Sequence, residues 1–186
     1  MTNVMNKIDA RTLSILQNPA VLAVSQDPEG ASAFRIWRYY VDDVDKFSKG
    51  EIQMYSGILS GGDQLVLFLN AGAKDREMNA SLVDVFWNDG PSGTSENIKK
   101  SWDIYDLWAN RMPNETANAI IDASYNLQSP SNVAAKVYSQ VPSSSSKELM
   151  GSKVGSVNAN GILKVNVQAH GVVMLRLRSQ NTKNEL

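Results

Sequence analysis

Hydrophobic and polar residues change their spacing near residue 30, from a helical period before it to a two-residue period after it. Asp9 precedes the segment 10–17, and Asn18 precedes the segment 19–24. Both side chains can accept hydrogen bonds from the first free N–H groups of a helix, so two short helices are predicted. The proline and glycine of 26–30 then predict a turn, which is the first boundary of the chain.

From residue 33 onward, aromatic and β-branched side chains recur in short alternating runs, as is typical of β-strands. The strands predicted from these runs cover 34–41, 52–58, 64–69, 98–108, 163–168 and 172–178. Tight turns at 61–63 and 169–171 join neighbouring strands into hairpins. Short strands in series predict a mainly β fold, an antiparallel β-sandwich after the short helical segment.

The first of these strands carries large side chains on both of its sides. Alternation gives two faces, Phe34, Ile36 and Tyr40 on one and Trp37, Tyr39 and Val41 on the other. Since apolar residues occupy both faces, the strand is expected to be half buried on each.

The segments after residue 114 show no regular strand pattern. The stretch 115–123 favours one or two helical turns, the serine-rich stretch 124–146 predicts a loop, and 180–186 predicts a frayed tail.

Composition excludes several classes of function. Lys and Arg number 18 against 19 Asp and Glu, a net charge of −1, so no positive excess is available to bind nucleic acid. The absence of cysteine rules out disulfides, thiolate zinc sites and cysteine nucleophiles. No apolar run approaches the roughly 20 residues of a membrane helix. The first residues lack the features of a signal peptide, so any signal is expected upstream of this chain.

Asp42, Asp43 and Asp45 cluster beside Lys46 after the first predicted strand. Such acids could bind a hard cation or supply the paired carboxylates of glycoside chemistry. The segment lacks the number of oxygen donors and the central glycine of a calcium loop. A hydrolase that relied on Asp42, Asp43 or Glu51 has no matching carboxylate motif either. A solvated turn is therefore the favoured interpretation, and no metal or cofactor is expected.

His170 is the single histidine, and it precedes Gly171 in a predicted turn. A Ser-His-Asp triad would need a serine that reaches it, and the chain has no Gly-x-Ser-x-Gly elbow. We therefore expect its ring to satisfy backbone groups in the turn. The glycine-rich stretch 57–62 matches no phosphate-binding motif and is interpreted as part of a hairpin.

Aromatic residues leave two interpretations open. Trp37, Trp87, Trp102 and Trp108 could form a platform on which sugar rings stack. In a sandwich such residues more often fill the core, and only a planar exposed set would favour carbohydrate binding. Packing in the core is the expected role.

Asn79 and Asn114 begin the two N-glycosylation acceptor motifs of the chain, Asn-Ala-Ser and Asn-Glu-Thr. Both lie in segments interpreted as strand ends or loops. The motif is short and occurs often by chance, so exposure of each asparagine is the necessary condition for a glycan.

Five stretches in the same order resemble the C-terminal part of secreted fungal α-galactosidases, retaining hydrolases also known as melibiases or glycoside hydrolase family 27. They are ILQNPAVLAVSQDPEG (15–30), RIWRYYVDDVDKFSKGEIQMYSGILSGGDQLVLFLNAG (35–72), MNASLVDVFWNDG (78–90), WDIYDLWANRM (102–112) and GSKVGSVNANGILKVNVQAHGVVMLRLR (151–178). The resemblance covers most of the chain, although none of the stretches is a catalytic signature.

This resemblance implies a (β/α)₈ barrel that bears the active site, followed by a β-sandwich. Residues 1–30 would be the end of the last barrel strand and its following helices, 33–178 the sandwich, and 179–186 a polar tail. The family's two catalytic aspartates would lie upstream of Met1. No catalytic or substrate-binding residue is therefore assigned here. The upstream barrel of the same secreted enzyme is the implied partner, and a galactoside is the substrate only of the full enzyme.

Two functions remain as alternatives. The first is the structural C-terminal portion of an α-galactosidase, inactive without its barrel. The second is a stand-alone sandwich that binds carbohydrate or serves a structural role by itself.

Overall fold

The computed structural model describes residues 8–46, 50–110, 114–115, 117–118 and 149–180. By internal contacts the chain divides into two compact units. One combines Met1–Ser25 with Trp108–Gly151, and the other combines Gln26–Leu107 with Ser152–Leu186. The predicted loop at 124–146 and almost all of the predicted tail lie outside the described residues, as does most of 115–123.

The first unit begins with the two helices that the capping residues predict, α1 (Ala10–Leu16) and α2 (Pro19–Ser25). The Asp9 carboxylate accepts a hydrogen bond of 2.6 Å from the N–H of Thr12. The Asn18 side chain accepts bonds of 3.0 and 3.2 Å from the N–H groups of Ala20 and Val21. Both helices thus start where a side chain replaces the missing backbone acceptor.

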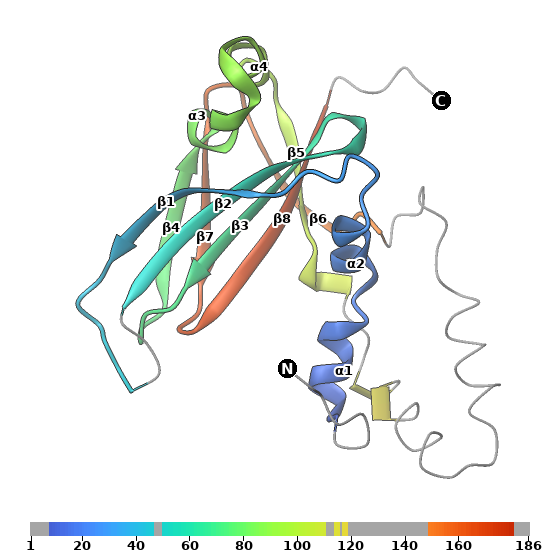
Figure 1. Cartoon of the computed structure of the whole chain (residues 1–186), viewed down its shortest axis with the longest axis vertical. Helices are drawn as coiled ribbons and strands as arrows, with labels where there is room; N and C mark the ends of the chain where they lie inside the picture. The colour runs from blue at the N-terminus through green and yellow to red at the C-terminus, as the bar shows by residue number, and fades with distance from the viewer. Residues whose placement is uncertain (1–7, 47–49, 111–113, 116, 119–148, 181–186) are drawn as a thin grey trace, which may run out of the picture. The chain divides into compact units, whose positions relative to one another are not determined.

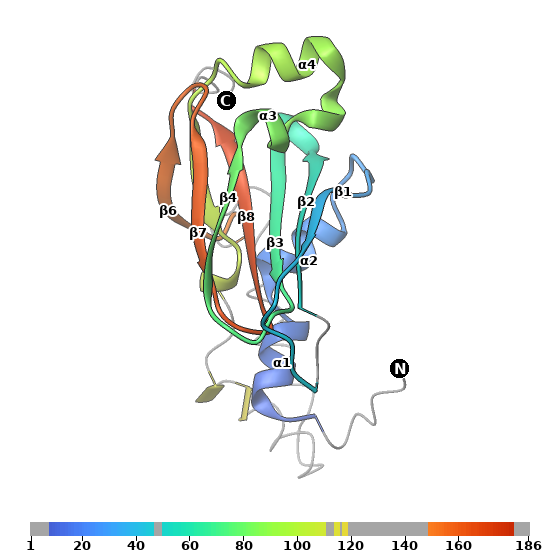
Figure 2. The same cartoon turned by 90° about the vertical axis from the view of Figure 1, so that its left-hand side faces the viewer.

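The second unit consists of two antiparallel sheets (Figure 1). The larger has the strand order β1-β2-β3-β8-β5-β6, and the smaller pairs β4 with β7. The strands are β1 (Phe34–Tyr40), β2 (Glu51–Leu59), β3 (Asp63–Asn70), β4 (Arg76–Ser81), β5 (Trp102–Asp106), β6 (Ser152–Val157), β7 (Ile162–Val167) and β8 (Gly171–Ser179). In Figure 2 the β4–β7 pair runs alongside β3 and β8. The predicted antiparallel β-sandwich is confirmed.

Apolar side chains between the two sheets form the core. Met54 and Phe68 lie opposite each other in the β2–β3 ladder, and both are fully buried. Trp102 of β5 is 1% exposed, with its ring centroid 4.8 Å from that of Phe86. From β4, Met78 enters this core while its neighbours in the strand face outward. The two-residue period of the sequence thus matches the pleat of the strands.

Short helices connect the strands at one end. They are η2 (Ser60–Gly62), α3 (Leu82–Val85), η3 (Trp87–Asp89) and α4 (Gly90–Asn97). A further short helix, η4 (Trp108–Asn110), belongs to the first unit. Gly61 and Gly62 have φ values of 73° and 76°, which confirms that this glycine pair forms the β2–β3 hairpin turn. None of the helices among the described residues is long and apolar enough to cross a membrane.

Three strand predictions need correction. The strand expected at 98–108 covers only Trp102–Asp106, because Ile98 still has helical dihedrals as the C-cap of α4. Strands β4 and β6 were not predicted, since REMNAS and SKVGSV contain few of the aromatic and β-branched residues that mark strands.

The predicted half burial of β1 is right for Ile36 and Trp37, which pack against the core, and wrong for the other aromatic residues of the strand. This strand lies at the edge of the larger sheet, and Phe34, Tyr39 and Tyr40 are 57%, 58% and 68% exposed. A β-bulge between Arg35 and Trp37 shifts the register, so that Phe34, Trp37 and Tyr39 share the face of their partners Ser56, Met54 and Ile52. The bulge is the reason why strict alternation assigned the wrong faces.

Candidate functional site

Most of the predicted chemistry gathers at one end of the sandwich, where the loops β1–β2, β3–β4 and β7–β8 meet (Figure 1). The N–H of Ala73 donates to the carbonyl of Asp43 at 3.0 Å, and the N–H of His170 donates to Gly72 at 3.2 Å. The Asp75 carboxylate accepts a 2.8 Å bond from the N–H of Ala169. We call this group of three loops the acidic end.

Asp43 is the most constrained acid of this end. Its carboxylate lies 2.5 Å from Nη2 of Arg76 and accepts the N–H of Lys74 at 2.9 Å, and its side chain is only 6% exposed. Burial acts to raise the pKa of Asp43, but hydrogen bonds from Arg76 and from backbone N–H groups outweigh it and hold this pKa below its ordinary value. The interpretation as a solvated turn is therefore wrong for Asp43, although Asp42 is exposed.

The ring of His170 has a partner that was not expected. Its Nε2 lies 2.7 Å from Oδ2 of Asp45, so it pairs with a carboxylate of another loop. The residue has a φ of 54°, a left-handed conformation that lets the chain reverse before Gly171. The pair ties the β1–β2 loop to the β7–β8 loop. No nucleophile elbow in the sequence completes a triad with these two residues.

Three acids of this end, Asp43, Asp45 and Asp75, bind cationic side chains or backbone N–H groups of the protein itself. Within the described part of the chain, no group of three or more His, Asp or Glu side chains is placed to hold a metal ion. A carboxylate fixed to Arg76 is also unsuited to proton transfer, because its charged form is stabilised. The chemistry that the geometry supports here is therefore loop fixation.

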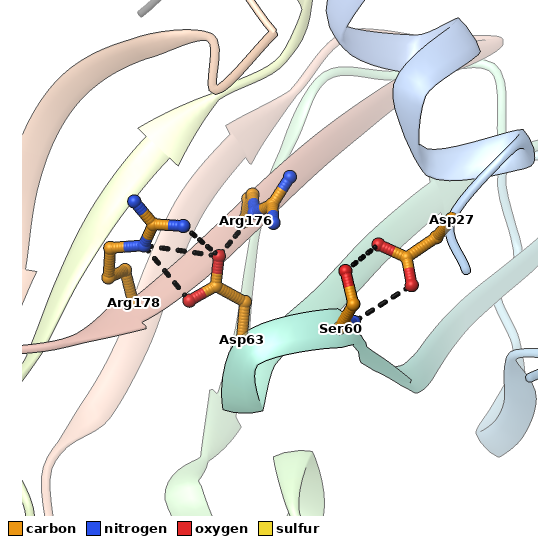
Figure 3. A network of polar contacts seen from close by, with 5 residues as sticks. All are labelled: Asp27, Ser60, Asp63, Arg176 and Arg178. Atoms are coloured by element: carbon orange, nitrogen blue, oxygen red, sulfur yellow. Dashed lines mark hydrogen bonds and ion pairs between the residues drawn. The ribbon is translucent and has the colours of Figure 1, made fainter. Parts of the chain in front are cut away.

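A second polar network lies at the opposite end of β3, as Figure 3 shows. Two arginine side chains of β8 converge on Asp63, whose side chain is 3% exposed. Nε of Arg176 donates to Oδ2 at 2.6 Å, and Nη2 of Arg178 donates to the same oxygen at 2.9 Å. The hydrogen bond with Asp63 raises the pKa of Arg178 against the opposing effect of burial. Asp63 thus holds two cations at the start of its strand.

Asp27 extends this network toward the turn that precedes β1. Its two carboxylate oxygens accept bonds from Ser60, 2.8 Å from the N–H and 2.9 Å from the hydroxyl. Burial acts to raise the pKa of Asp27, but the bonds from Ser60 and Glu29 and the charge of Arg176 lower it overall. The turn predicted at 26–30 is therefore hydrogen-bonded through Asp27 to Ser60 of the β2–β3 turn.

Sequence reasoning missed this second network. Arg176 and Arg178 alternate with Leu175 and Leu177, which marks one polar and one apolar face of β8. That alternation gives no clue to the partner, because Asp63 lies 113 residues away from Arg176.

The tryptophans do not form a planar exposed set. Trp102 is buried, Trp37 and Trp108 are half buried, and Trp87 alone among the described tryptophans is exposed, at 66%. Trp87 borders an open hollow of about 330 Å³. The other lining residues are Val83, Gly90, Thr94, Ser95 and Ile98. The expectation of core packing is right for Trp102 and wrong for Trp87.

Both acceptor asparagines are exposed. Asn79 lies within β4, opposite Lys164 of β7, rather than at a strand end as expected. Its neighbours Met78 and Ala80 point into the core, so the side chain of Asn79 faces outward. The hydroxyl of Ser81, the third residue of this acceptor motif, bonds to Asp84 in a capping box at the start of α3. Exposure, the condition for a glycan, is met at both asparagines.

Comparison with known proteins gives one consistent family. The model described as the alpha galactosidase C-terminal beta sandwich domain matches residues 49–137. An α-galactosidase of Saccharomyces paradoxus is 44% identical over 178 residues, which cover 95% of this chain and 37% of that enzyme. Alpha-galactosidase 5 of Saccharomyces cerevisiae is 43% identical over 175 residues, with 94% and 37% covered.

Solved structures agree with this comparison. The structure of α-galactosidase from Saccharomyces cerevisiae with raffinose matches with a TM-score of 0.78 at 40% identity, and the match covers 95% of this chain and 39% of that one. The chain therefore spans about 37% of the length of the relatives it matches.

Proposed function

The chain carries the C-terminal β-sandwich of the α-galactosidase family, and from this premise we propose that it is the non-catalytic part of a retaining α-galactosidase acting on terminal α-linked galactose. The observation that carries the proposal is that the match covers nearly all of this chain but only 37% of the relative. Similarity extends over 95% of this chain, whereas well over half of the relative lies outside the match. The activity of the whole enzyme then depends on that other part.

The state of the acids supports this assignment. Retaining hydrolysis needs two carboxyl groups about 5–5.5 Å apart, one as nucleophile and one as acid and base. Asp43 is committed to Arg76, Asp45 to His170 and Asp63 to two arginines. We therefore assign no catalytic and no substrate-binding residue to this chain, and place both catalytic aspartates in the upstream part.

The central strand β3 supports a structural role. Val66 and Phe68 point into the core between the sheets, and Leu65, Leu67 and Leu69 alternate with them on the other face. A strand that is apolar on both faces is stable only where a layer covers each face. Such a sheet is suited to holding further structure rather than to lining an aqueous site.

The remaining assignments follow from the family. Residues 1–30 correspond in this proposal to the end of the barrel, 33–178 to the sandwich and 179–186 to a polar tail. The upstream (β/α)₈ barrel is the partner, and a galactoside is the substrate of the whole enzyme. The protein is secreted, with a signal peptide upstream of this chain and glycans on Asn79 and Asn114, whose exposure supports modification.

Two assays test the proposed function. The purified chain alone is expected to release no galactose from a chromogenic α-galactoside, and a sugar titration is expected to show no binding. A chimera in which this chain replaces the matching part of the Saccharomyces paradoxus enzyme is expected to hydrolyse the same substrate. Turnover by the isolated chain that disappears in the Asp42→Asn or Asp43→Asn variant would refute the proposal.

A further inference from the structure

Three exposed apolar side chains lie at the end of the sandwich where β4 leads into α3. Val83, Trp87 and Ile162 are 43%, 66% and 56% exposed, and we call them the Trp87 patch. We propose that the Trp87 patch binds the N-glycan attached to Asn79, whose first sugars lie over these side chains. The inference rests on the proposed function, in which Asn79 carries a glycan, and deepens it by assigning the surface that the glycan covers.

Backbone contacts bring the three residues of the patch together. The N–H of Leu82 donates to the carbonyl of Gly161 at 3.1 Å, so their neighbours in the chain, Val83 and Ile162, lie at the same end of the β4–β7 pair. Val83 and Trp87 are placed by α3 and η3 and border the same open hollow. Figure 2 shows α3 and α4 at this end of the pair.

Asn79 lies on the face of the β4–β7 pair at which the patch begins. Asn79 and Ile162 are exposed, whereas Ala80 and Leu163, which follow them in their strands, are buried. Lys164 lies opposite Asn79, so Ile162 is a diagonal neighbour of Asn79, at a Cβ separation of roughly 7–8 Å in an antiparallel ladder. The start of α3 is about 10 Å farther along the strand. The whole patch is therefore within reach of the first sugars of a glycan on Asn79.

The hollow beside the patch suits a carbohydrate. A pyranose ring has apolar faces of C–H groups and an edge of hydroxyls, and an aromatic ring offers the apolar area on which such a face can stack. Trp87, Val83 and Ile98 supply apolar lining, and Ser95 supplies an exposed hydroxyl. The volume of about 330 Å³ lies at the lower end of the roughly 300–1,000 Å³ of small-molecule sites, which are lined in the same way.

The surroundings of the patch argue against a second copy of the chain as its occupant. Glu77, Lys164 and Asn166 are the exposed neighbours of Asn79 on this face, and all are polar. Three apolar side chains, of which an aromatic one buries roughly 150–250 Å², fall short of the roughly 800 Å² that each partner of a stable dimer buries. A bulky, hydrated glycan on Asn79 would also stand between this face and another protein. The occupant is therefore the glycan of the chain itself.

Attachment explains how weak contacts can fill so open a site. A ligand on a short tether has an effective concentration in the millimolar range, about that at which weak binding becomes appreciable. Stacking of one or two sugars then suffices to hold the glycan, whereas a free sugar at ordinary concentrations leaves the hollow empty. The assignment thus agrees with the absence of free-sugar binding that is expected of the purified chain.

Hydroxyl-radical footprinting of Trp87 tests the assignment. The chain is expressed in a eukaryotic host behind a signal peptide and is compared before and after its glycans are removed by glycosidase. Oxidation of Trp87 is expected to be at least about threefold slower with the glycan in place, because a stacked sugar covers most of an indole that is 66% exposed. Tyr40 of β1, which is 68% exposed, serves as the reference and is expected to oxidise equally in both samples. Equal oxidation of Trp87 in the two samples overturns the assignment.

Matched variants separate the glycan contact from folding. Asn79→Gln should raise the oxidation of Trp87 to the level of the glycosidase-treated chain, whereas Asn114→Gln should leave the protection unchanged. Ile162→Ser removes an apolar side chain between Asn79 and Trp87 and should weaken the protection, whereas Val154→Ser on β6, where the side chain is 59% exposed, should not. Both serine variants are expected to keep the urea midpoint of the glycan-free chain. Equal effects within either pair contradict the proposal.

Other occupants of the patch give distinct results. Protection of Trp87 in the glycan-free chain that grows with protein concentration would identify a second copy, and protection by an added α-galactoside would identify a site for free sugar. Either result overturns the assignment, as does a secreted product in which Asn79 is unmodified. Activity of the chimera with the Saccharomyces paradoxus catalytic part reports on the proposed function separately, since the footprint of Trp87 decides the glycan contact whether or not a galactoside is cleaved.

Discussion

Replacing Asp63 by asparagine should be the most destabilising single change of charge in the sandwich. The carboxylate is 3% exposed and lies between Arg176, which is 9% exposed, and Arg178, which is 44% exposed. Asparagine keeps the size and one acceptor oxygen but removes the negative charge. Arg176 is then left as a buried cation without compensation.

The size of the effect follows from these exposures. Removing one partner of a buried ion pair costs about 3–5 kcal/mol, whereas an exposed pair contributes about 0–1 kcal/mol. The bond to Arg176 belongs to the first class and the bond to Arg178 lies between the two. With one acceptor retained, we expect a loss of about 3 kcal/mol in the free energy of unfolding. For a protein of this length that corresponds to a decrease of about 6–12 °C in Tm.

Urea unfolding followed by tryptophan fluorescence measures this loss, because Trp102 is buried in the same unit. Asp42→Asn is the matched control, since Asp42 is exposed, and a surface change of this kind is expected to stay within about 0.5 kcal/mol. Joint replacement of Asp63 by leucine and Arg176 by methionine should recover part of the stability, because the two most buried charges of the network are then both removed. If Asp63→Asn unfolds at the same urea concentration as Asp42→Asn, the reasoning is wrong.

The other predictions concern acid stability, glycosylation and the core. The pKa of Asp43 is lowered in the folded state. The stabilising effect of its carboxylate is therefore complete above the ordinary pKa of 3.8 and disappears as the pH falls through the lower pKa of the folded state. The Asp43→Asn variant should accordingly show a weaker dependence of Tm on pH in that acidic range. Expression in a eukaryotic host behind a signal peptide should give a product whose mass falls on glycosidase treatment, and Asn79→Gln and Asn114→Gln should each remove one glycan, which intact mass measurement detects. Trp102→Ala should lower the free energy of unfolding, measured in urea, by about 3–5 kcal/mol, because it leaves a cavity beside Phe86. A decrease of less than about 1 kcal/mol would show that the cavity collapses or that Trp102 is not part of the core.

Features determined by neighbouring residues could be predicted from the sequence. The caps at Asp9 and Asn18 and the glycine turn at 61–63 are recognisable because the side chain and the backbone that it serves lie within a few residues. The antiparallel sandwich also follows from the two-residue period. Strand β4 was missed because its alternation is carried by methionine and alanine rather than by β-branched residues.

The features that were missed depend on contacts distant in the sequence. His170 and Asp45 are 125 residues apart, so no local pattern could show that the ring pairs with a carboxylate. The edge position of β1 depends on which strands pair, and composition alone cannot distinguish an aromatic strand in the core from one at an edge. The family resemblance identified the domain, but the polar networks became visible only with the side chains in place.

The bulge in β1 also bears on how this strand can change over evolution. Ile36 is the extra residue, since Arg35 pairs with Tyr55 and Trp37 with the next partner, Met54. Loss of Ile36 would leave an unbroken ladder in which every remaining side chain keeps its face, whereas loss of a residue from a regular part of the strand would turn the following side chains to the opposite face. Length variants of this strand should therefore gather at position 36, where a deletion preserves the pattern of aromatic residues and arginines.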